Sequence, residues 1–183
     1  MQNDVIMAGF GGQGILLIGK MLAYAGMREG KEVSWLPSYG PEMRGGTANC
    51  TVVISDRPVG SPVIQSPRAV VAMNLPSLDK FETDVRPGGL LLVNTSLIER
   101  KSTRDDVTII EVPANQIANE LGNRRGANMV ALGAYLGATD AVSVDEIVEV
   151  IRETFATKPG VVDINIKALH RGHEIGAACT VGV

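Results

Sequence analysis

The sequence predicts an α/β fold in which an open, mainly parallel sheet carries helices on both faces. Short apolar or β-branched runs alternate along the chain with segments whose apolar residues recur at helical spacing. The first such pair, Asn3–Gly9 and Gly12–Glu29, is joined by a glycine-rich turn, and several later runs are short and wholly apolar, as in strands buried on both faces. At 183 residues, the chain is expected to form one domain, residues 1–183, with a Rossmann-like three-layer architecture.

Each element is predicted from its own local pattern. The predicted strands are Asn3–Gly9, Lys31–Leu36, Thr47–Ile54, Val70–Met73, Leu90–Val93 and Val107–Val112, with a short edge strand at Val59–Ile64 between prolines. The predicted helices are Gly12–Glu29, Leu78–Phe81, Asn115–Leu121, Ala127–Ala138, Val144–Phe155 and Ile164–Ile175. Gly30 and Gly122 are expected to end helices, and residues 143–146 form a capping-box pattern that begins one.

Two of these helices are more apolar than a surface helix requires. The first carries one stripe of apolar residues and then a second, formed by Leu17, Met21 and Tyr24. Ala127–Ala138 contains no charged residue and several small ones. The extra apolar surface either packs within the same fold or faces another subunit, so homodimerisation of the isolated chain stays open.

Composition limits the classes of function. The net charge of −3 and the scattered aromatic residues argue against nucleic-acid binding. The N-terminal residues do not resemble a signal peptide, and no apolar run has the length of a membrane helix, so we expect a cytoplasmic protein without membrane contact. Cys50 and Cys179 lie far apart, which fits a reducing compartment and excludes an iron–sulfur cluster held by this chain alone. His170 and His173 are too few ligands for a zinc site, and no metal site is predicted.

The turn after the first strand has the spacing G-x-G-x-x-G, with glycines at positions 9, 11 and 14. Glycine permits a tight turn, and the helix N-terminus behind it offers free N–H groups to an anion. A dinucleotide site also needs an acidic residue at the end of the second strand, and Lys31–Leu36 ends without one. A free-standing nicotinamide-dependent dehydrogenase therefore stays only an alternative. Another phosphate-bearing ligand, a partner subunit or packing alone explains the turn better.

The segment Ser38–Gly46 follows the second strand and contains turn signals together with Glu42 and Arg44. Ligands of open α/β sheets bind beyond the carboxyl ends of the strands, so this segment and the glycine turn are expected at the same edge. Arg44 either binds a phosphate or carboxylate or forms an internal ion pair with an acid such as Glu42. A structural role is expected for Glu42 rather than a catalytic one.

Three segments together, residues 9–14, 38–50 and 128–133, resemble the gamma subunits of 2-oxoacid:ferredoxin oxidoreductases and the gamma domain of pyruvate:ferredoxin oxidoreductase. The resemblance covers essentially the whole chain and is strongest to the 2-oxoglutarate and branched-chain types. The second segment is long and far more specific than the glycine turn. An indolepyruvate-type subunit shares this domain and is an alternative, as is a binding or regulatory module outside such an enzyme.

The resemblance implies a subunit of an enzyme that converts a 2-oxoacid, with 2-oxoglutarate expected first, to an acyl-CoA and passes electrons to ferredoxin. Thiamine diphosphate, Mg²⁺ and the iron–sulfur cluster would be held by other subunits, and coenzyme A would bind with them. The implied partners are an alpha subunit, a thiamine diphosphate-binding beta subunit, a ferredoxin-like delta subunit and ferredoxin. The isolated chain would be inactive and would hold no cofactor and no catalytic residue.

The cofactor-binding candidates come from the first two segments of the resemblance. They are Gly9, Gly11, Gly12, Gln13, Gly14, Tyr39, Gly40, Pro41, Glu42, Arg44, Gly45 and Gly46. We expect the glycine turn to act through its main chain and Arg44 to contact coenzyme A or the thiamine-bearing subunit. Asn128 begins an apolar helix and is expected to cap that helix or to anchor a loop.

Overall fold

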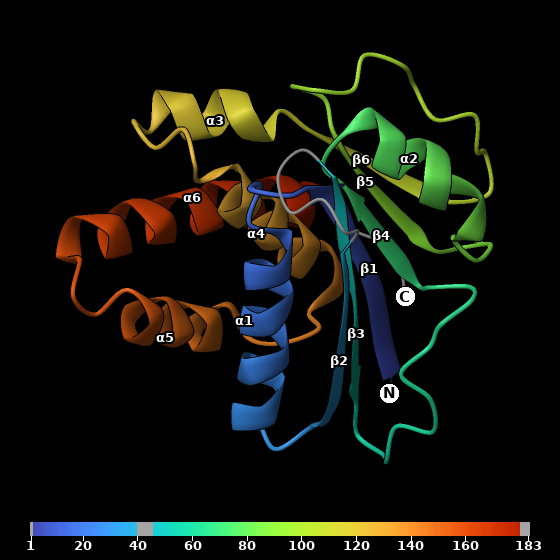
Figure 1. The fold of residues 1–183 in the computed structure, drawn as a ribbon, viewed down its shortest axis with the longest axis horizontal. Helices are drawn as coiled ribbons and strands as arrows, with labels where there is room; N and C mark the ends of the chain where they lie inside the picture. Colours follow the sequence, from blue (N-terminus) through green and yellow to red (C-terminus); the bar gives the residue numbers. More distant parts are fainter. Residues whose placement is uncertain (1, 40–45, 180–183) are drawn as a thin grey trace.

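The computed structural model describes residues 2–39 and 46–179, which form six strands, six α-helices and one short 3₁₀ helix (Figure 1). The strands are β1 (Gln2–Phe10), β2 (Glu32–Tyr39), β3 (Thr47–Ser55), β4 (Ala69–Ala72), β5 (Leu90–Asn94) and β6 (Thr108–Val112). The helices are α1 (Ile15–Arg28), α2 (Leu75–Phe81), η1 (Glu82–Asp84), α3 (Ala114–Glu120), α4 (Ala127–Thr139), α5 (Val144–Thr154) and α6 (Pro159–Ala178).

One mixed sheet joins all six strands in the order β2-β3-β1-β4-β5-β6. β1, β4, β5 and β6 are parallel, and only β3 runs against its neighbours, between β1 and β2. The short connection between β2 and β3 suits an antiparallel pair, because parallel neighbours need a longer crossover. The predicted mainly parallel sheet is therefore confirmed, with one antiparallel strand inside it.

Helices cover the two faces of the sheet unequally. α1, α4, α5 and α6 lie on one side, where they share the larger core with the apolar residues of the strands (Figure 1). α2 lies on the other side, over a smaller core of strand residues that includes Ile6, Val70 and Leu91. This arrangement confirms the predicted α/β class with helices on both faces.

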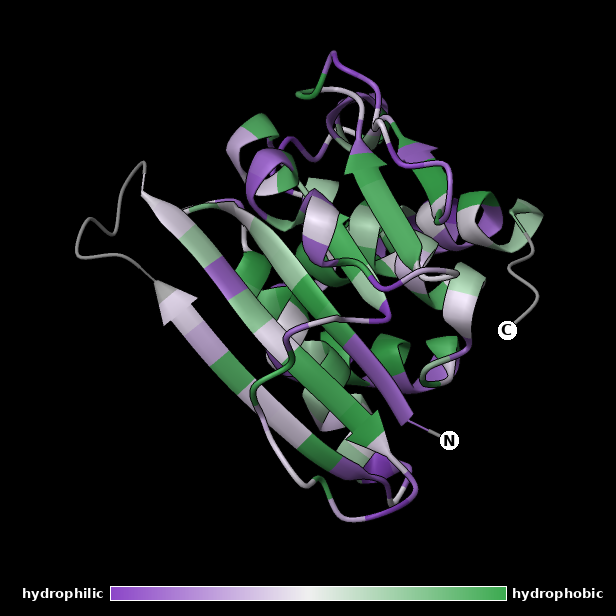
Figure 2. Cartoon of the chain, turned by 90° about the vertical axis from the view of Figure 1, so that its right-hand side faces the viewer, coloured by the Kyte–Doolittle hydropathy of each residue, from purple (hydrophilic) through white to green (hydrophobic). Residues whose placement is uncertain are grey.

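The α2 side of the sheet is covered less completely over β2 and β3 than over β4 and β5 (Figure 2). Leu36 of β2 and Phe10 of β1 keep 40% and 37% of their surface exposed. The predicted edge strand at Val59–Ile64 is wrong, because the chain between β3 and β4 contains no strand. Pro58 and Pro62 lack the N–H groups that a ladder requires, which explains the difference.

Close helix packing explains why α4 is so apolar. A Cβ on Gly133 would lie 1.9 Å from the Leu169 carbonyl oxygen of α6, and one on Gly172 would lie 1.9 Å from the Val130 carbonyl oxygen of α4. Only glycine lets the two backbones approach so closely. α4 is therefore a core helix, and its apolar surface packs within the fold rather than against another subunit.

The second apolar stripe of α1 divides between the core and the surface. Met21 is buried and Leu17 partly buried, whereas Tyr24 keeps 45% of its surface exposed.

α5 begins as predicted, with the Ser143 hydroxyl accepting a hydrogen bond from the Asp145 N–H. α6 is longer than predicted and begins at Pro159. In the part of the chain that the structure describes, no helix is both long and apolar enough to cross a bilayer.

Candidate functional site

The glycine turn carries the chain from the carboxyl end of β1 into α1. Gly12 and Gly14 have φ angles of +99° and +74°, which side-chain-bearing residues rarely adopt. Gly14 occupies the N-cap position of α1, and no side chain caps this helix end. The first-turn N–H groups of α1 have no partner within the helix, and no other residue that the structure describes accepts a hydrogen bond from them, so they suit an anionic ligand.

The Gln13 side chain braces this turn from inside. Its Oε1 accepts a hydrogen bond from the Phe10 N–H at 2.6 Å, and its Nε2 donates to the Met73 carbonyl oxygen at 3.4 Å. Asn74, at the end of β4, also donates to Gln13 Oε1. A Cβ on Gly9 would lie 2.5 Å from the same oxygen, so Gly9 makes room for this brace. The geometry favours a positioning role for Gln13 over direct ligand binding.

The second motif meets the glycine turn at the same edge of the sheet. The Gly11 N–H donates to the Gly46 carbonyl oxygen at 2.9 Å, and Phe10 pairs with Thr47 where β1 and β3 adjoin. Tyr39, the last residue of β2, pairs with Ala48. The expectation that the two motifs converge is therefore confirmed. Five further candidates of this motif, Gly40, Pro41, Glu42, Arg44 and Gly45, lie outside the described residues.

Asn128 ties the third motif to the same turn. Its Nδ2 donates to the Gly14 carbonyl oxygen at 3.3 Å, and its Oδ1 accepts from the Met129 N–H. A Cβ on Gly14 would lie 2.4 Å from Asn128 Nδ2, so glycine is required for both its φ angle and the contact. The anchoring role expected for Asn128 is confirmed. All three motifs thus meet at one junction.

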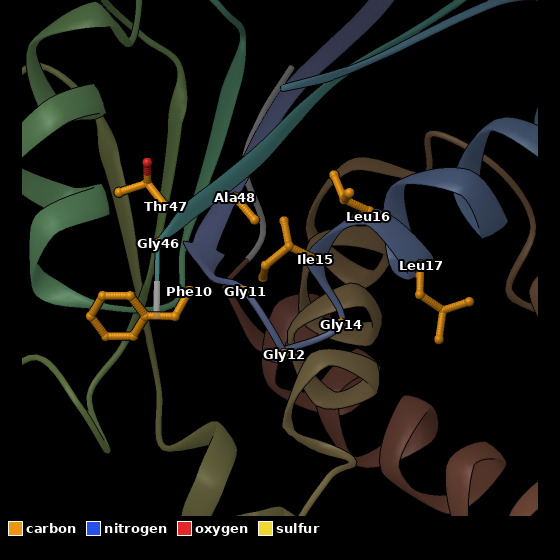
Figure 3. A pocket seen from close by; sticks show the side chains of 10 residues that line it. All are labelled: Phe10, Gly11, Gly12, Gly14, Ile15, Leu16, Leu17, Gly46, Thr47 and Ala48. Atoms are coloured by element: carbon orange, nitrogen blue, oxygen red, sulfur yellow. The ribbon is translucent and has the colours of Figure 1, made fainter. Parts of the chain in front are cut away.

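An apolar pocket of about 460 Å³ opens between the first two motifs (Figure 3). It is lined by Phe10, Gly11, Gly12, Gly14, Ile15, Leu16, Leu17, Gly46, Thr47 and Ala48. Thr47 carries the only polar side chain among these ten residues. The pocket therefore offers main-chain N–H groups and apolar surface, which suits an aliphatic chain or a partner's side chain better than acid–base chemistry.

A more polar pocket of about 340 Å³ lies on the other side of the turn. Its lining includes Gly12 and Gly14 together with Asn123, Arg125 and Lys158. Arg125 is an exposed loop residue that borders this pocket. Sequence reasoning missed Lys158, although the Pro159 that follows it marks the first turn of a helix. Two cations thus stand near the N–H groups of α1.

A network of side-chain amides at the carboxyl ends of β4 and β5 was also missed. Asn94 is fully buried, and its Nδ2 donates to Met73 and Asn115 while its Oδ1 accepts from the Ala114 N–H. Asn74 caps α2 by accepting from the Ser77 N–H. An asparagine at or close to the end of an apolar strand is the signal that points to them. Asn74 and Asn94 bond Gln13 and Met73, so these residues stabilise the strand ends that contact the glycine turn.

The strand order disfavours the nicotinamide alternative. A dinucleotide site places the ribose-binding acid on the parallel strand next to β1. Here antiparallel β3 occupies that position, and β2 lies one strand further out. The carboxyl end of β2 consists of Trp35, Leu36, Pro37, Ser38 and Tyr39, without a carboxylate.

Comparison with known proteins agrees with this geometry. Residues 4–175 match the model of the pyruvate ferredoxin/flavodoxin oxidoreductase family. The chain is 46% identical over 170 residues to ketoisovalerate oxidoreductase subunit VorA of Methanothermobacter marburgensis; the match covers 92% of this chain and 35% of that relative. It therefore spans about a third of the length of this relative.

Two solved structures share the fold. The gamma subunit of a keto/oxoacid ferredoxin oxidoreductase from Geobacter sulfurreducens PCA matches with a TM-score of 0.82 and 31% identity, over 96% of this chain and 99% of that one. The 2-oxoglutarate:ferredoxin oxidoreductase from Magnetococcus marinus, with 2-oxoglutarate, coenzyme A and succinyl-CoA bound, matches with a TM-score of 0.91 and 26% identity, over 99% of this chain and 32% of that one. The resemblance to the gamma subunits is confirmed, and the chain belongs to the pyruvate ferredoxin/flavodoxin oxidoreductase family.

Proposed function

We propose that this chain is the gamma subunit of a cytoplasmic 2-oxoacid:ferredoxin oxidoreductase. In this proposal it assembles with an alpha subunit, a thiamine diphosphate-binding beta subunit and a ferredoxin-like delta subunit. Those partners hold thiamine diphosphate, Mg²⁺ and the iron–sulfur cluster, and the isolated chain is inactive.

The observation that carries this role is the junction of the three motifs. Gly11 bonds Gly46 through the main chain, and Asn128 bonds Gly14. The motif residues that the structure describes thus shape and brace one edge instead of presenting an acid–base pair. Phe10 remains 37% exposed beside the apolar pocket. Exposed apolar surface of this kind is typical of a site that binds a partner or a ligand.

Coenzyme A is the ligand we propose for this edge. A long aliphatic arm fits the apolar pocket beside Phe10 and Ile15. Phosphate groups fit the free N–H groups at the start of α1, with Gly12 and Gly14 allowing close approach. The solved relative named with coenzyme A bound supports this choice of ligand. In this proposal the glycine turn binds through its main chain, Gln13 positions the turn, and Arg44 contacts the ligand or the thiamine-bearing subunit.

Two 2-oxoacids are candidates for the substrate of the complex. The solved relative from Magnetococcus marinus, which supports the expected 2-oxoglutarate, is 26% identical. The VorA relative, whose name indicates ketoisovalerate, is 46% identical. The higher identity favours a branched-chain 2-oxoacid, with 2-oxoglutarate as the second candidate.

Reconstitution tests the proposal. The chain would be co-expressed with the alpha, beta and delta subunits from its own organism, purified through a tag on this chain, and assayed for viologen reduction with coenzyme A. We expect a thiamine diphosphate-containing complex that turns over ketoisovalerate or 2-oxoglutarate at least tenfold faster than pyruvate. Failure to co-purify a thiamine-binding subunit would count against the proposal.

Arg44→Ala tests the second motif within that complex. Because a guanidinium–phosphate contact contributes roughly 1.5–3 kcal/mol, we expect the KM for coenzyme A to rise about tenfold or more, or the complex to dissociate at lower salt. Arg152→Ala is the matched control, because Arg152 is exposed on α5 and pairs only with Glu149 within the described residues. Unchanged KM, turnover and assembly in Arg44→Ala would remove Arg44 from the site.

A further inference from the structure

A third cavity, of about 370 Å³, lies at the opposite end of the sheet, where β1, β4 and β5 begin. Its volume is within the range of small-ligand sites. It is lined by Asn3, Asp4, Arg68, Ala69, Arg86, Gly88, Gly89, Leu90, Tyr135 and Thr139. Tyr135 and Thr139 belong to the last turns of α4. Two half-buried arginines, Arg68 and Arg86, therefore border one cavity.

Main-chain hydrogen bonds fix both arginines at this cavity. The Arg68 carbonyl oxygen accepts from the Leu90 N–H at 2.8 Å, and the Arg86 carbonyl oxygen accepts from the Gly89 N–H at 2.9 Å. A Cβ on Gly89 would lie 2.7 Å from the first oxygen and 2.8 Å from the second. Gly89 is thus held between the two arginine backbones. Their side chains start from rigid positions on neighbouring segments.

Neither guanidinium forms an ion pair or a side-chain hydrogen bond with any residue between 2 and 39 or between 46 and 179. Asp4 is the acid at the cavity, and its Oδ1 accepts the Arg68 main-chain N–H at 2.6 Å. Asp106, whose carbonyl oxygen accepts the Gly88 N–H, directs its carboxylate to Arg104 instead.

The remaining lining groups leave an excess of positive charge. Burial raises the pKa of the Tyr135 phenol, so Tyr135 stays neutral and cannot serve as a counter-ion. The carboxyl end of α4 contributes the equivalent of about half a negative charge. Together with Asp4, it does not balance two guanidinium groups. Burial and, after it, repulsion from Arg68 lower the pKa of Arg86, whereas attraction by Asp4 acts in the opposite direction.

We propose that this cavity binds the phosphate group of a small molecule between Arg68 and Arg86. Two guanidinium forks offer the donors and the double positive charge that a phosphate dianion prefers. Asn3 also lines the cavity, and its side-chain amide is a neutral donor. The site uses none of the residues of the three motifs, so phosphate binding here can be tested independently of coenzyme A binding at the glycine turn.

The test is titration of the full chain with inorganic phosphate, by calorimetry and by thermal melting, against chloride at matched ionic strength. We expect saturable phosphate binding and a higher melting temperature in phosphate. Arg86→Gln and Arg68→Gln should each weaken phosphate binding about tenfold or more, because each removes a charged donor. Arg124→Gln is the matched control: it removes the same charge from an exposed position outside the cavity and should bind like the wild type.

Stability without ligand distinguishes a binding pair from a structural one. In phosphate-free buffer, Arg86→Gln should melt at or above the wild-type temperature, because it removes a repulsive, partly desolvated charge. A large drop in melting temperature with phosphate binding unchanged would mean that Arg86 is structural and would overturn the proposal. No phosphate effect beyond that of chloride, an equal loss in Arg124→Gln, or tighter binding of succinate than of phosphate would overturn it as well.

Discussion

At the scale of single residues, Cys50 shows how burial decides chemistry. Its side chain, on β3, is fully buried and lies against Gly19 of α1, close to Trp35 of β2. Its thiol donates a weak hydrogen bond to the Ile15 carbonyl oxygen. Cys50 therefore serves as a small core side chain.

Burial raises the pKa of the Cys50 thiol to about 12, although a hydrogen bond with Trp35 acts in the opposite direction. At pH 8 the thiolate is therefore scarce, and alkylating reagents cannot reach it. We expect iodoacetamide at pH 8 to modify the partly exposed Cys179 and to leave Cys50 intact, as read by peptide mass spectrometry. Both cysteines should react in denaturant. Equal labelling of the two in the native protein would contradict the burial argument.

At the scale of elements, the contact between α4 and α6 restricts which residues the two helices can carry. Four glycines, Gly133 and Gly137 of α4 and Gly172 and Gly176 of α6, face the backbone of the opposite helix. The small residues of α4 were visible in the sequence, but their partner helix was not. Their spacing fits a subunit contact as well as an internal one, and only the structure identifies α6 as the partner.

Gly172→Ala should force the two helices apart, because the new Cβ would meet the Val130 carbonyl group. Overpacking against a rigid backbone typically costs 1–3 kcal/mol and outweighs the gain in helix propensity, so we expect the free energy of unfolding in urea to fall by about 2 kcal/mol. Gly160→Ala, in the first turn of the same helix, has no atom within 4 Å of its Cβ. It should stabilise the protein by up to about 1 kcal/mol. Equal effects would contradict the packing argument.

At the scale of the whole molecule, Glu82 joins the end of α2 to the loop before β6. Its carboxylate accepts hydrogen bonds from Arg100 at 2.7 Å and from the Thr103 N–H at 3.0 Å. Burial acts to raise the pKa of Glu82, but the bonds from Arg100, Ser102 and Thr103 outweigh it and leave the pKa below its usual value.

A lowered pKa in the folded state stabilises the fold above the ordinary glutamate pKa of about 4.3, and this stabilisation is lost as the pH falls through the folded-state value. Glu82→Gln should therefore lower the free energy of unfolding by about 1–3 kcal/mol at pH 7 and should lose less stability than the wild type below pH ~4.3. Chemical denaturation between pH 3 and 7 measures both effects. Glu149→Gln, at an exposed pair on α5, should change stability by less than about 0.5 kcal/mol. If the free energy of unfolding fell with pH in parallel for the wild type and Glu82→Gln, Glu82 would not be the source of the acid-dependent loss of stability.

The sequence alone determined what depends on local pattern: the α/β class, most elements, the glycine turn, and the three motifs that identify the family. It missed what depends on contacts between distant segments. The antiparallel place of β3, the hydrogen bonds of Gln13 to Met73 and Asn74, and the position of Arg68 and Arg86 at one cavity depend on residues that lie 18 to 61 positions apart along the chain. Side-chain periodicity reports which face of an element is buried, but not which element covers it. Tertiary structure alone decided the partners, because packing and strand pairing select among arrangements that share the same local pattern.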